Sequence, residues 1–225
     1  MFANAMRVED YLQTDLLPLQ LNQRVDFALG MMDDMKISHL PLLNGDIFLG
    51  LVSEEQLNDI EDETLVLSEA HLFPLTIFIG SDRSIHDLLH IFAKSDYSIV
   101  PVLSADGLYA GYVSASQMCK ELAKILQADK AGGVLIFEMA KKNYHLSEIA
   151  HLLEAEDVRI LNLLTIPLAD SEEMQVIIKL DTLDLSRLVK TFSRFEYKVK
   201  ASQYDDSLDL NQGDRYELLM KYLNF

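Results

Sequence analysis

The sequence predicts an α+β protein in which one unit occurs twice and a split βαβ domain follows. The first observation behind this prediction is that residues 22–35 are repeated, without a gap, at residues 82–95. The second is that apolar runs after residue 131 follow the order strand, helix, strand, strand, helix, strand. Gly132-Gly133 lies between the two patterns, so we place the predicted domain boundary there.

Each copy of the repeated unit is predicted to begin with a short edge strand and an amphipathic helix. Apolar residues recur at i, i+3, i+4 and i+7, which is one face of a helix; they are Val25, Ala28, Leu29 and Met32, then Ile85, Leu88, Leu89 and Phe92. Asn22 and Asp82 stand three residues before these stripes, and we expect their side chains to cap the two helices.

A hairpin is predicted to follow each helix. Residues 39–43, with Pro41 at their centre, match residues 99–103, with Pro101 at theirs. Asn-Gly and Asp-Gly dipeptides come next, and such pairs are typical of tight turns between strands. One copy alone would leave an apolar sheet face uncovered, so we expect the two copies to pack against each other.

Each copy closes on a similar segment, Gly-Leu-Val-Ser-Glu-Glu-Gln-Leu at residues 50–57 and Gly-Tyr-Val-Ser-Ala-Ser-Gln-Met at residues 111–118. Together with the strand proline and the glycine turn, this close resembles the CBS domain, which occurs in tandem as a Bateman module. The resemblance implies a first CBS repeat over residues 1–63 and a second over residues 64–130. It also implies a homodimer, because members of this family pair through their helices.

The resemblance further implies a nucleotide cleft in each repeat. In CBS domains that bind adenosine nucleotides, a serine or threonine contacts phosphate or ribose, and an aspartate three residues later holds the ribose diol. Here glutamine stands at the aspartate position. The implied second cleft consists of Ile99, Val100, Pro101, Ser114, Ser116 and Gln117, and the first of His39, Leu40, Pro41, Ser53 and Gln56. Glu54 and Glu55 would repel a phosphate, so the second cleft is favoured for AMP, ADP or ATP.

Residues 131–203 are predicted to form a ferredoxin-like sheet with both helices on one face. This order, with the segment Leu146–Leu153 and the run Phe195–Val199, resembles the ACT domain, a module that senses small molecules. ACT sites usually have a glycine after the first strand, where this chain has Tyr144, and we expect that side chain to fill the amino-acid site. Residues 204–225 are predicted as a tail that ends in a helix through Tyr216, Leu219, Met220 and Leu223. The whole order resembles bacterial regulatory proteins of the acetoin-utilisation type.

Composition excludes several classes of function. The formal net charge of −17 argues against a nucleic-acid partner and against adsorption to anionic membranes. The single cysteine, Cys119, cannot form an internal disulfide, and it is expected to be a small buried side chain. The sequence starts without a basic-then-apolar signal region and has no membrane-length apolar stretch, so a cytoplasmic protein is expected.

Three hypotheses for function follow. The first is a non-enzymatic regulatory module that binds an adenosine nucleotide and signals to an unidentified protein partner. The second is a ligandless protein for dimerisation and docking. The third is a zinc hydrolase on His86 and His90, whose i, i+4 spacing suits a zinc-binding helix. The first copy lacks this pair, and neither a nucleophile elbow nor a phosphate-cradling loop occurs, so an enzyme is not expected.

Overall fold

The computed structural model describes residues 6–204, with side chains described as far as residue 199. The chain divides into two compact units, residues 1–121 and residues 122–225, and each is described by itself. The predicted α+β class is confirmed, because each unit combines helices with a separate β-structure. The predicted terminal helix lies outside the described residues. Within residues 6–204, no helix combines the length and apolar character that crossing a bilayer requires.

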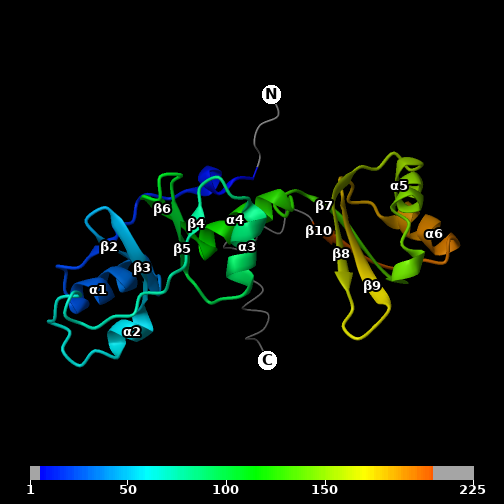
Figure 1. The fold of residues 1–225 in the computed structure, drawn as a ribbon. Coiled ribbons are helices and arrows are strands. Elements are labelled where there is room, and N and C mark those ends of the chain that lie inside the picture. The colour runs from blue at the N-terminus through cyan, green and yellow to red at the C-terminus, as the bar shows by residue number, and fades with distance from the viewer. Residues whose placement is uncertain (1–5, 205–225) are drawn as a thin grey trace, which may run out of the picture. The chain divides into compact units, whose positions relative to one another are not determined.

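Unit one contains two copies of one arrangement of strands and helices (Figure 1). The first copy comprises β1 (Leu19–Gln20), α1 (Val25–Met35), β2 (His39–Asn44), β3 (Ile47–Ser53) and α2 (Glu54–Asn58). The second comprises β4 (Ile79–Gly80), α3 (Ile85–Ala93), β5 (Ile99–Leu103), β6 (Tyr109–Ser114) and the start of α4 (Ala115–Ile125), of which residues 115–121 belong to unit one. A 3₁₀ turn, η1 (Val8–Tyr11), stands before the first copy.

The two sheets of unit one share their topology and even their irregularities. The strand orders are β1-β2-β3 and β4-β5-β6, with a parallel first pair and an antiparallel hairpin in each. The register shifts between Leu42 and Leu43 in one hairpin and between Val102 and Leu103 in the other. The duplication read from the sequence is therefore confirmed at the level of individual backbone positions.

The two copies exchange their leading segments. We call residues 6–16 the first arm and residues 65–77 the second arm. The first arm precedes the first copy but pairs with the second: Gln13 forms a bridge with Tyr112 through hydrogen bonds of 2.8 and 3.0 Å. The second arm pairs in the same way with the first copy, where Leu75 bridges Leu51 at 2.7 and 2.9 Å. Each copy is therefore completed by the arm that directly precedes the other copy in the sequence.

Two glycines allow the arms to come this close. Gly50 has φ +149°, and a Cβ added there would lie 2.6 Å from Pro74 Cβ and 2.9 Å from Leu75 O. Gly111 has φ +147°, and a Cβ there would overlap the backbone oxygen of Gln13. Only glycine adopts such φ values without strain and leaves room for a neighbouring backbone.

The predicted helix caps were wrong. α1 begins at Val25 after Arg24, and α3 begins at Ile85 after Ser84, so Asn22 and Asp82 lie outside both caps. At α3, Ser84 and Asp87 form a capping box.

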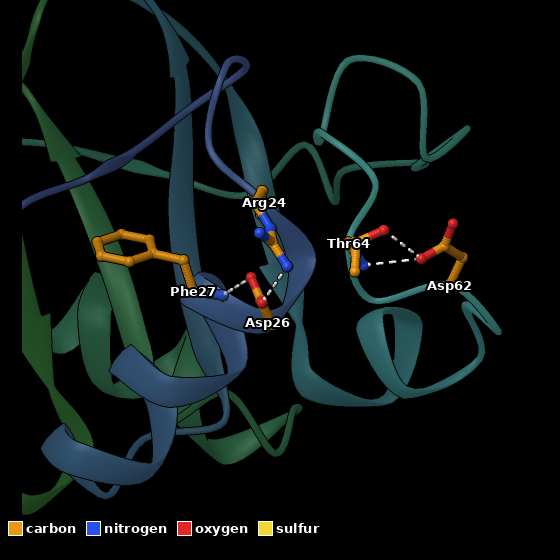
Figure 2. Close-up of polar contacts among 5 residues, drawn as sticks. All are labelled: Arg24, Asp26, Phe27, Asp62 and Thr64. Atoms are coloured by element: carbon orange, nitrogen blue, oxygen red, sulfur yellow. Dashed lines mark hydrogen bonds and ion pairs between the residues drawn. The ribbon is translucent and has the colours of Figure 1, made fainter.

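At α1, backbone carbonyls take the place of a side-chain cap. Leu65 O of the second arm accepts a hydrogen bond from Val25 N at 3.0 Å, and Glu63 O, just before that arm, accepts one from Asp26 N at 2.9 Å. Figure 2 shows this start of α1, where Arg24 forms an ion pair with Asp26 at 2.6 Å. The exposed residues Asp62 and Thr64, which precede the second arm, face it.

The core of unit one is continuous across both copies. It includes Met32, Leu40 and Leu51 of the first copy together with Ile99 and Tyr112 of the second. Leu67 of the second arm belongs to the same cluster, and Val8 of the first arm is fully buried. The predicted packing of one copy against the other is confirmed, and the arms contribute to it.

Unit two is a four-stranded antiparallel sheet with two helices on one face (Figure 1). Its elements are β7 (Gly132–Ala140), η2 (Lys141–Asn143), α5 (Leu146–Glu154), β8 (Ile160–Pro167), β9 (Glu173–Leu180), α6 (Ser186–Arg194) and β10 (Lys198–Tyr204). The strand order β10-β7-β9-β8 is that of a ferredoxin-like fold, as predicted. Phe137, Phe192 and Tyr197 form an aromatic cluster at its core, with centroids 4.9 to 5.4 Å apart.

Candidate functional site

A pocket of about 530 Å³ lies where β3 runs into α2, beside the start of β2. We call it the first cleft. Its lining residues are Ser38, His39, Ser53, Glu54, Glu55, Asn58, Asp59 and Asp96, the last contributed by the second copy. Of the residues predicted for this cleft, His39 and Ser53 line it. Leu40 and Pro41 are buried in the sheet behind, and Gln56 lines a neighbouring pocket of about 260 Å³.

Ser53 and Gln56 are brought together, but as the cap of α2. Ser53 Oγ accepts a hydrogen bond from Gln56 N at 3.2 Å, and Gln56 Oε1 accepts one from Ser53 N at 3.3 Å. Gln56 Nε2 then donates to Phe73 O of the second arm at 2.9 Å. The capping box uses the oxygen of the Gln56 amide, and the contact with the second arm uses its nitrogen. Ser53 Oγ keeps its own proton available for a ligand, because the capping contact only accepts.

His39 is held as a neutral imidazole at the edge of the first cleft. Its Nδ1 accepts from Ser98 N at 3.4 Å and lies 3.0 Å from Ser38 Oγ and 3.3 Å from Ser98 Oγ. The ring packs edge-on against Tyr97 with centroids 5.3 Å apart. Burial lowers the pKa of His39 and outweighs the opposing charge of Glu54. With Nδ1 as the acceptor, Nε2 carries the proton and is a potential donor to a ligand.

The first cleft has a strongly acidic lining. Glu54, Glu55, Asp59 and Asp96 contribute carboxylates, and no lysine or arginine is among the lining residues. Carboxylates accept hydrogen bonds from hydroxyl and amino groups, and they repel phosphate. The arrangement therefore suits a neutral or cationic polar molecule better than a polyphosphate.

The residues predicted for the second cleft differ from those of the first, because a side chain from the first arm bonds to their serine. Ser114 is 6% exposed, and its Oγ donates to Gln13 Oε1 at 2.8 Å while its backbone N donates to the same oxygen at 3.1 Å. Ser114 Oγ also accepts from Gln117 N at 3.2 Å and lies 3.2 Å from Ser116 Oγ. The predicted residues Ser116 and Gln117 are thus brought to Ser114, which in turn bonds to Gln13.

Sequence reasoning missed Gln13 entirely, since it lies 101 positions from Ser114 and belongs to neither repeated motif. The strand residues predicted for the second cleft, Ile99, Val100 and Pro101, are buried, and Ile99 pairs with Ser114 across the hairpin. The serine at the centre of this cleft therefore has its hydroxyl proton already donated within the protein.

The remaining candidate groups fall elsewhere. His86 and His90 are exposed on α3, and residues 6–204 contain no group of three metal-ligating side chains of the His, Cys, Asp and Glu types. Cys119 is exposed on α4, so the expectation of a buried side chain was wrong. In this apolar run, the neighbouring side chain of Met118 is the one that is buried.

In unit two, Tyr144 packs against the core, next to a pocket of about 520 Å³. The lining of that pocket includes Asn143, His145 and four glutamates, Glu138, Glu148, Glu173 and Glu196. Burial, and to a lesser extent the charge of Glu148, raises the pKa of Tyr197, which lies on the same wall.

No protein-family model and no curated protein sequence matches the chain. Solved structures of CBS-domain pairs resemble part of it. A CBS domain pair/ACT domain protein from Thermotoga maritima is 20% identical over 53% of this chain and 98% of its own, with a TM-score of 0.47. CBSX2 of Arabidopsis thaliana, solved in complex with AMP, is 19% identical over 56% and 100%, with a TM-score of 0.47. The CBS domains of a transcriptional regulator from Streptococcus pneumoniae are 16% identical over 52% and 99%, with a TM-score of 0.46.

Proposed function

We propose that this chain is a non-enzymatic regulatory module that binds an adenosine-type ligand in the first cleft. The observation that carries the proposal is the pocket of about 530 Å³ whose rim combines the Ser53 hydroxyl, the neutral His39 ring and a set of carboxylates. A volume of this size accommodates a nucleoside. Carboxylates can accept hydrogen bonds from both hydroxyls of a ribose. Gln56 does not take this role, because its amide already bonds to Phe73 O.

The charge of the first cleft sets the order of ligands that we propose. Each added phosphate brings negative charge toward Glu54, Glu55 and Asp59. Adenosine should therefore bind more tightly than AMP, and AMP more tightly than ATP. This proposal moves the ligand from the second cleft, which the sequence favoured, because Gln13 already satisfies the second serine.

The proposal includes a homodimer and a protein partner in the cytoplasm. An exposed stripe on α1 supports the dimer: Phe27 and Met35 are 49% and 40% exposed, and Met31 lies between them at helical spacing. The equivalent positions are Asp87 and Ile91 on α3 and Ser95 just beyond its end, and they are less apolar. Unit two, as an ACT-like module, would pass a change in ligand occupancy to the partner.

A specific observation favours one alternative, a ligandless interaction protein. Both cleft serines already make hydrogen bonds within the chain, Ser53 with Gln56 and Ser114 with Gln13. A protein whose clefts serve only to hold its copies together would show the same contacts.

Isothermal titration of the full chain with adenosine, AMP and ATP tests the proposal. We expect saturable binding of adenosine, with affinity falling by about tenfold from adenosine to ATP at low ionic strength. Thermal melting provides a second readout, because a ligand at about 100 times its Kd adds ~2.7 kcal/mol to the unfolding free energy. Absence of heat and of any melting shift with millimolar adenosine would leave the ligandless alternative.

A further inference from the structure

The sheet of unit two has one face toward α5 and α6 and a second face away from them (Figure 1). Strand residues alternate between the two faces. Four residues of β7 and β9 belong to the core that the sheet shares with the helices: Leu135, Phe137, Val176 and Ile178. Ile136 and Ile177 alternate with them and are not part of that core, so they lie on the second face. We call this second face the open face.

The strand register aligns an apolar row across the open face. Ile136 of β7 is opposite Ile177 of β9, and Ile177 is opposite Leu164 of β8. Directly opposite side chains share a face and are close enough to contact each other. Leu164 is 39% exposed, and Ile166, two residues further along β8 and thus on the same face, is 45% exposed. The row is therefore continuous and ends in accessible apolar side chains.

The neighbouring row of the open face is already covered by the segment that follows α4. Lys179 and Asn162 are opposite each other in that row. Lys179 Nζ donates to Gln127 O at 2.5 Å and to Ala128 O at 3.2 Å. Asn162 Nδ2 donates to Leu126 O. Lys179 is only 6% exposed, so the open face is a surface on which a helix end packs closely.

The sequence after Tyr204 supplies a segment that matches the apolar row. Residues 205–214 are mostly polar, and a helix with one apolar stripe is predicted after them from the sequence alone. The stripe consists of Tyr216, Leu219, Met220 and Leu223. A short helix of this kind gains its stability from packing its stripe against another apolar surface.

The chain is long enough to bring this segment to the row. β10 ends at Tyr204, on the edge strand next to β7. Residues 205–215 separate Tyr204 from Tyr216, and an extended chain of that length spans up to about 35 Å. The sheet is only about 15 Å wide from β10 to β8. A helix over residues 215–223 is about 13 Å long, which suits the width of the apolar row.

The size of the row favours the chain's own tail over a second copy. A specific interface between proteins uses roughly 800 Å² and about 20 to 30 residues on each partner. Three aligned side chains with Ile166 beside them offer far less. A tail needs less contact area, because its covalent link to β10 gives it an effective concentration on the order of millimolar.

We propose that residues 215–225 fold back as a helix on the open face of unit two, with Leu219 and Met220 packed against Ile136, Ile177 and Leu164. The tail then covers the apolar row beside the segment that follows α4. A protein partner that uses this row must first displace the tail.

Photo-crosslinking in the full chain tests this contact. The photo-reactive residue benzoylphenylalanine in place of Leu219 should label peptides that contain Ile136, Ile177 or Leu164, which mass spectrometry identifies. The same residue in place of Leu218 is the matched control: Leu218 lies outside the stripe, so labelling of these peptides should be several-fold weaker. Irradiation of a mixture of isotopically heavy and light chains shows whether both ends of a crosslink belong to one molecule.

Methyl nuclear magnetic resonance gives a second readout without a crosslinker. Leu219→Asp places a charge in the stripe and should shift the methyl resonances of Ile136 and Ile177 in the full chain. Leu218→Asp adds the same charge outside the stripe and should leave those resonances in place.

Each outcome decides the proposal. Labelling of the row by the residue at position 219, within one molecule, supports it. Labelling of the row between two molecules assigns the row to a second copy and overturns it. Labelling elsewhere, no labelling, or equal labelling from positions 218 and 219 also overturns it, and so do methyl resonances that Leu219→Asp leaves unchanged. None of these outcomes bears on the first-cleft function, which depends on unit one alone.

Discussion

The first and second copies of unit one share a backbone and differ in how their central serine is used. In both, an arm bridges the hairpin next to a glycine of φ near +148°, with values of +149° and +147°. Both serines accept a hydrogen bond from the backbone N three residues further on. In the first copy the arm residue is Leu75, whereas in the second it is Gln13, to which the serine also donates its hydroxyl proton. One side chain of an arm, a segment that belongs to neither motif, therefore decides whether the serine hydroxyl keeps its proton free or donates it within the chain.

The largest effect on this comparison is expected from removing the room for the first arm. Gly111→Ala places a Cβ against the backbone oxygen of Gln13 at a strained φ, so the bridge to Tyr112 must break or shift. We expect a loss of about 3 kcal/mol in the unfolding free energy. Chemical denaturation followed by circular dichroism measures this loss.

Gly30→Ala serves as the control for that experiment. Gly30 lies inside α1, and a Cβ there meets nothing within 4 Å, so the substitution should stabilise the chain by about 0.5–1 kcal/mol. Equal effects of the two substitutions would show that the first arm does not hold the second copy.

The next effect compares the two serines. Ser114→Ala leaves Gln13 Oε1 without one buried donor and Gln117 N without its acceptor, and we expect a loss of about 2 kcal/mol. Ser53→Ala removes one capping bond at an accessible helix start, for which we expect about 1 kcal/mol. Urea midpoints of the two variants provide the comparison, and a larger loss for Ser53→Ala would contradict a stabilising role of the bond between Ser114 and Gln13.

A smaller effect should appear in ligand preference. Glu54→Gln with Glu55→Gln removes two of the carboxylates of the first cleft and keeps their shapes. The ratio of ATP affinity to adenosine affinity should rise by about tenfold, or ~1.4 kcal/mol, at low salt. Titration calorimetry measures both affinities, and Glu61→Gln with Glu63→Gln, two exposed glutamates that do not line the first cleft, is the matched charge control. An unchanged ratio would place the nucleotide outside this cleft.

The smallest effect concerns pH. Burial lowers the pKa of His39 in the folded chain below its usual value near 6.5, so the unfolded chain binds more protons in the window just below that value. Stability contributed by neutral His39 is present above this window and is lost as the pH falls through it. His39→Gln should therefore flatten the decline in melting temperature between about pH 7 and pH 5.5. The same slope in both proteins would assign the decline to other groups.

The sequence predicted the repeated elements well because their signals are local. The i, i+3, i+4 stripes of α1 and α3 and the glycine turns of the two hairpins report the structure of their own segments, and so does the strand and helix order of unit two. The caps failed at Asn22 because the donors of α1 are met by backbone from residues 63 and 65. No pattern of side chains in the sequence predicts which backbone carbonyls will accept hydrogen bonds from the start of a helix.

The site was harder to predict for the same reason. Ser53 and His39 were found from their motif, and they do line the first cleft. Asp96 comes from the other copy, and Gln13 reaches Ser114 from the first arm. Both depend on the packing of the copies and on the exchange of arms, which a reading of each repeat on its own cannot supply. The preference for the second cleft rested on local charge and could not include the bonds between Gln13 and Ser114.

A crystal structure of the full wild-type chain grown with adenosine tests the central claim most directly. The account predicts one nucleoside per chain, with its ribose between Ser53, Glu54 and Asp96, while Gln13 remains hydrogen-bonded to Ser114. A nucleoside on Ser114 in the wild-type chain, or one bound only in the pocket beside Tyr197 of unit two, would contradict it.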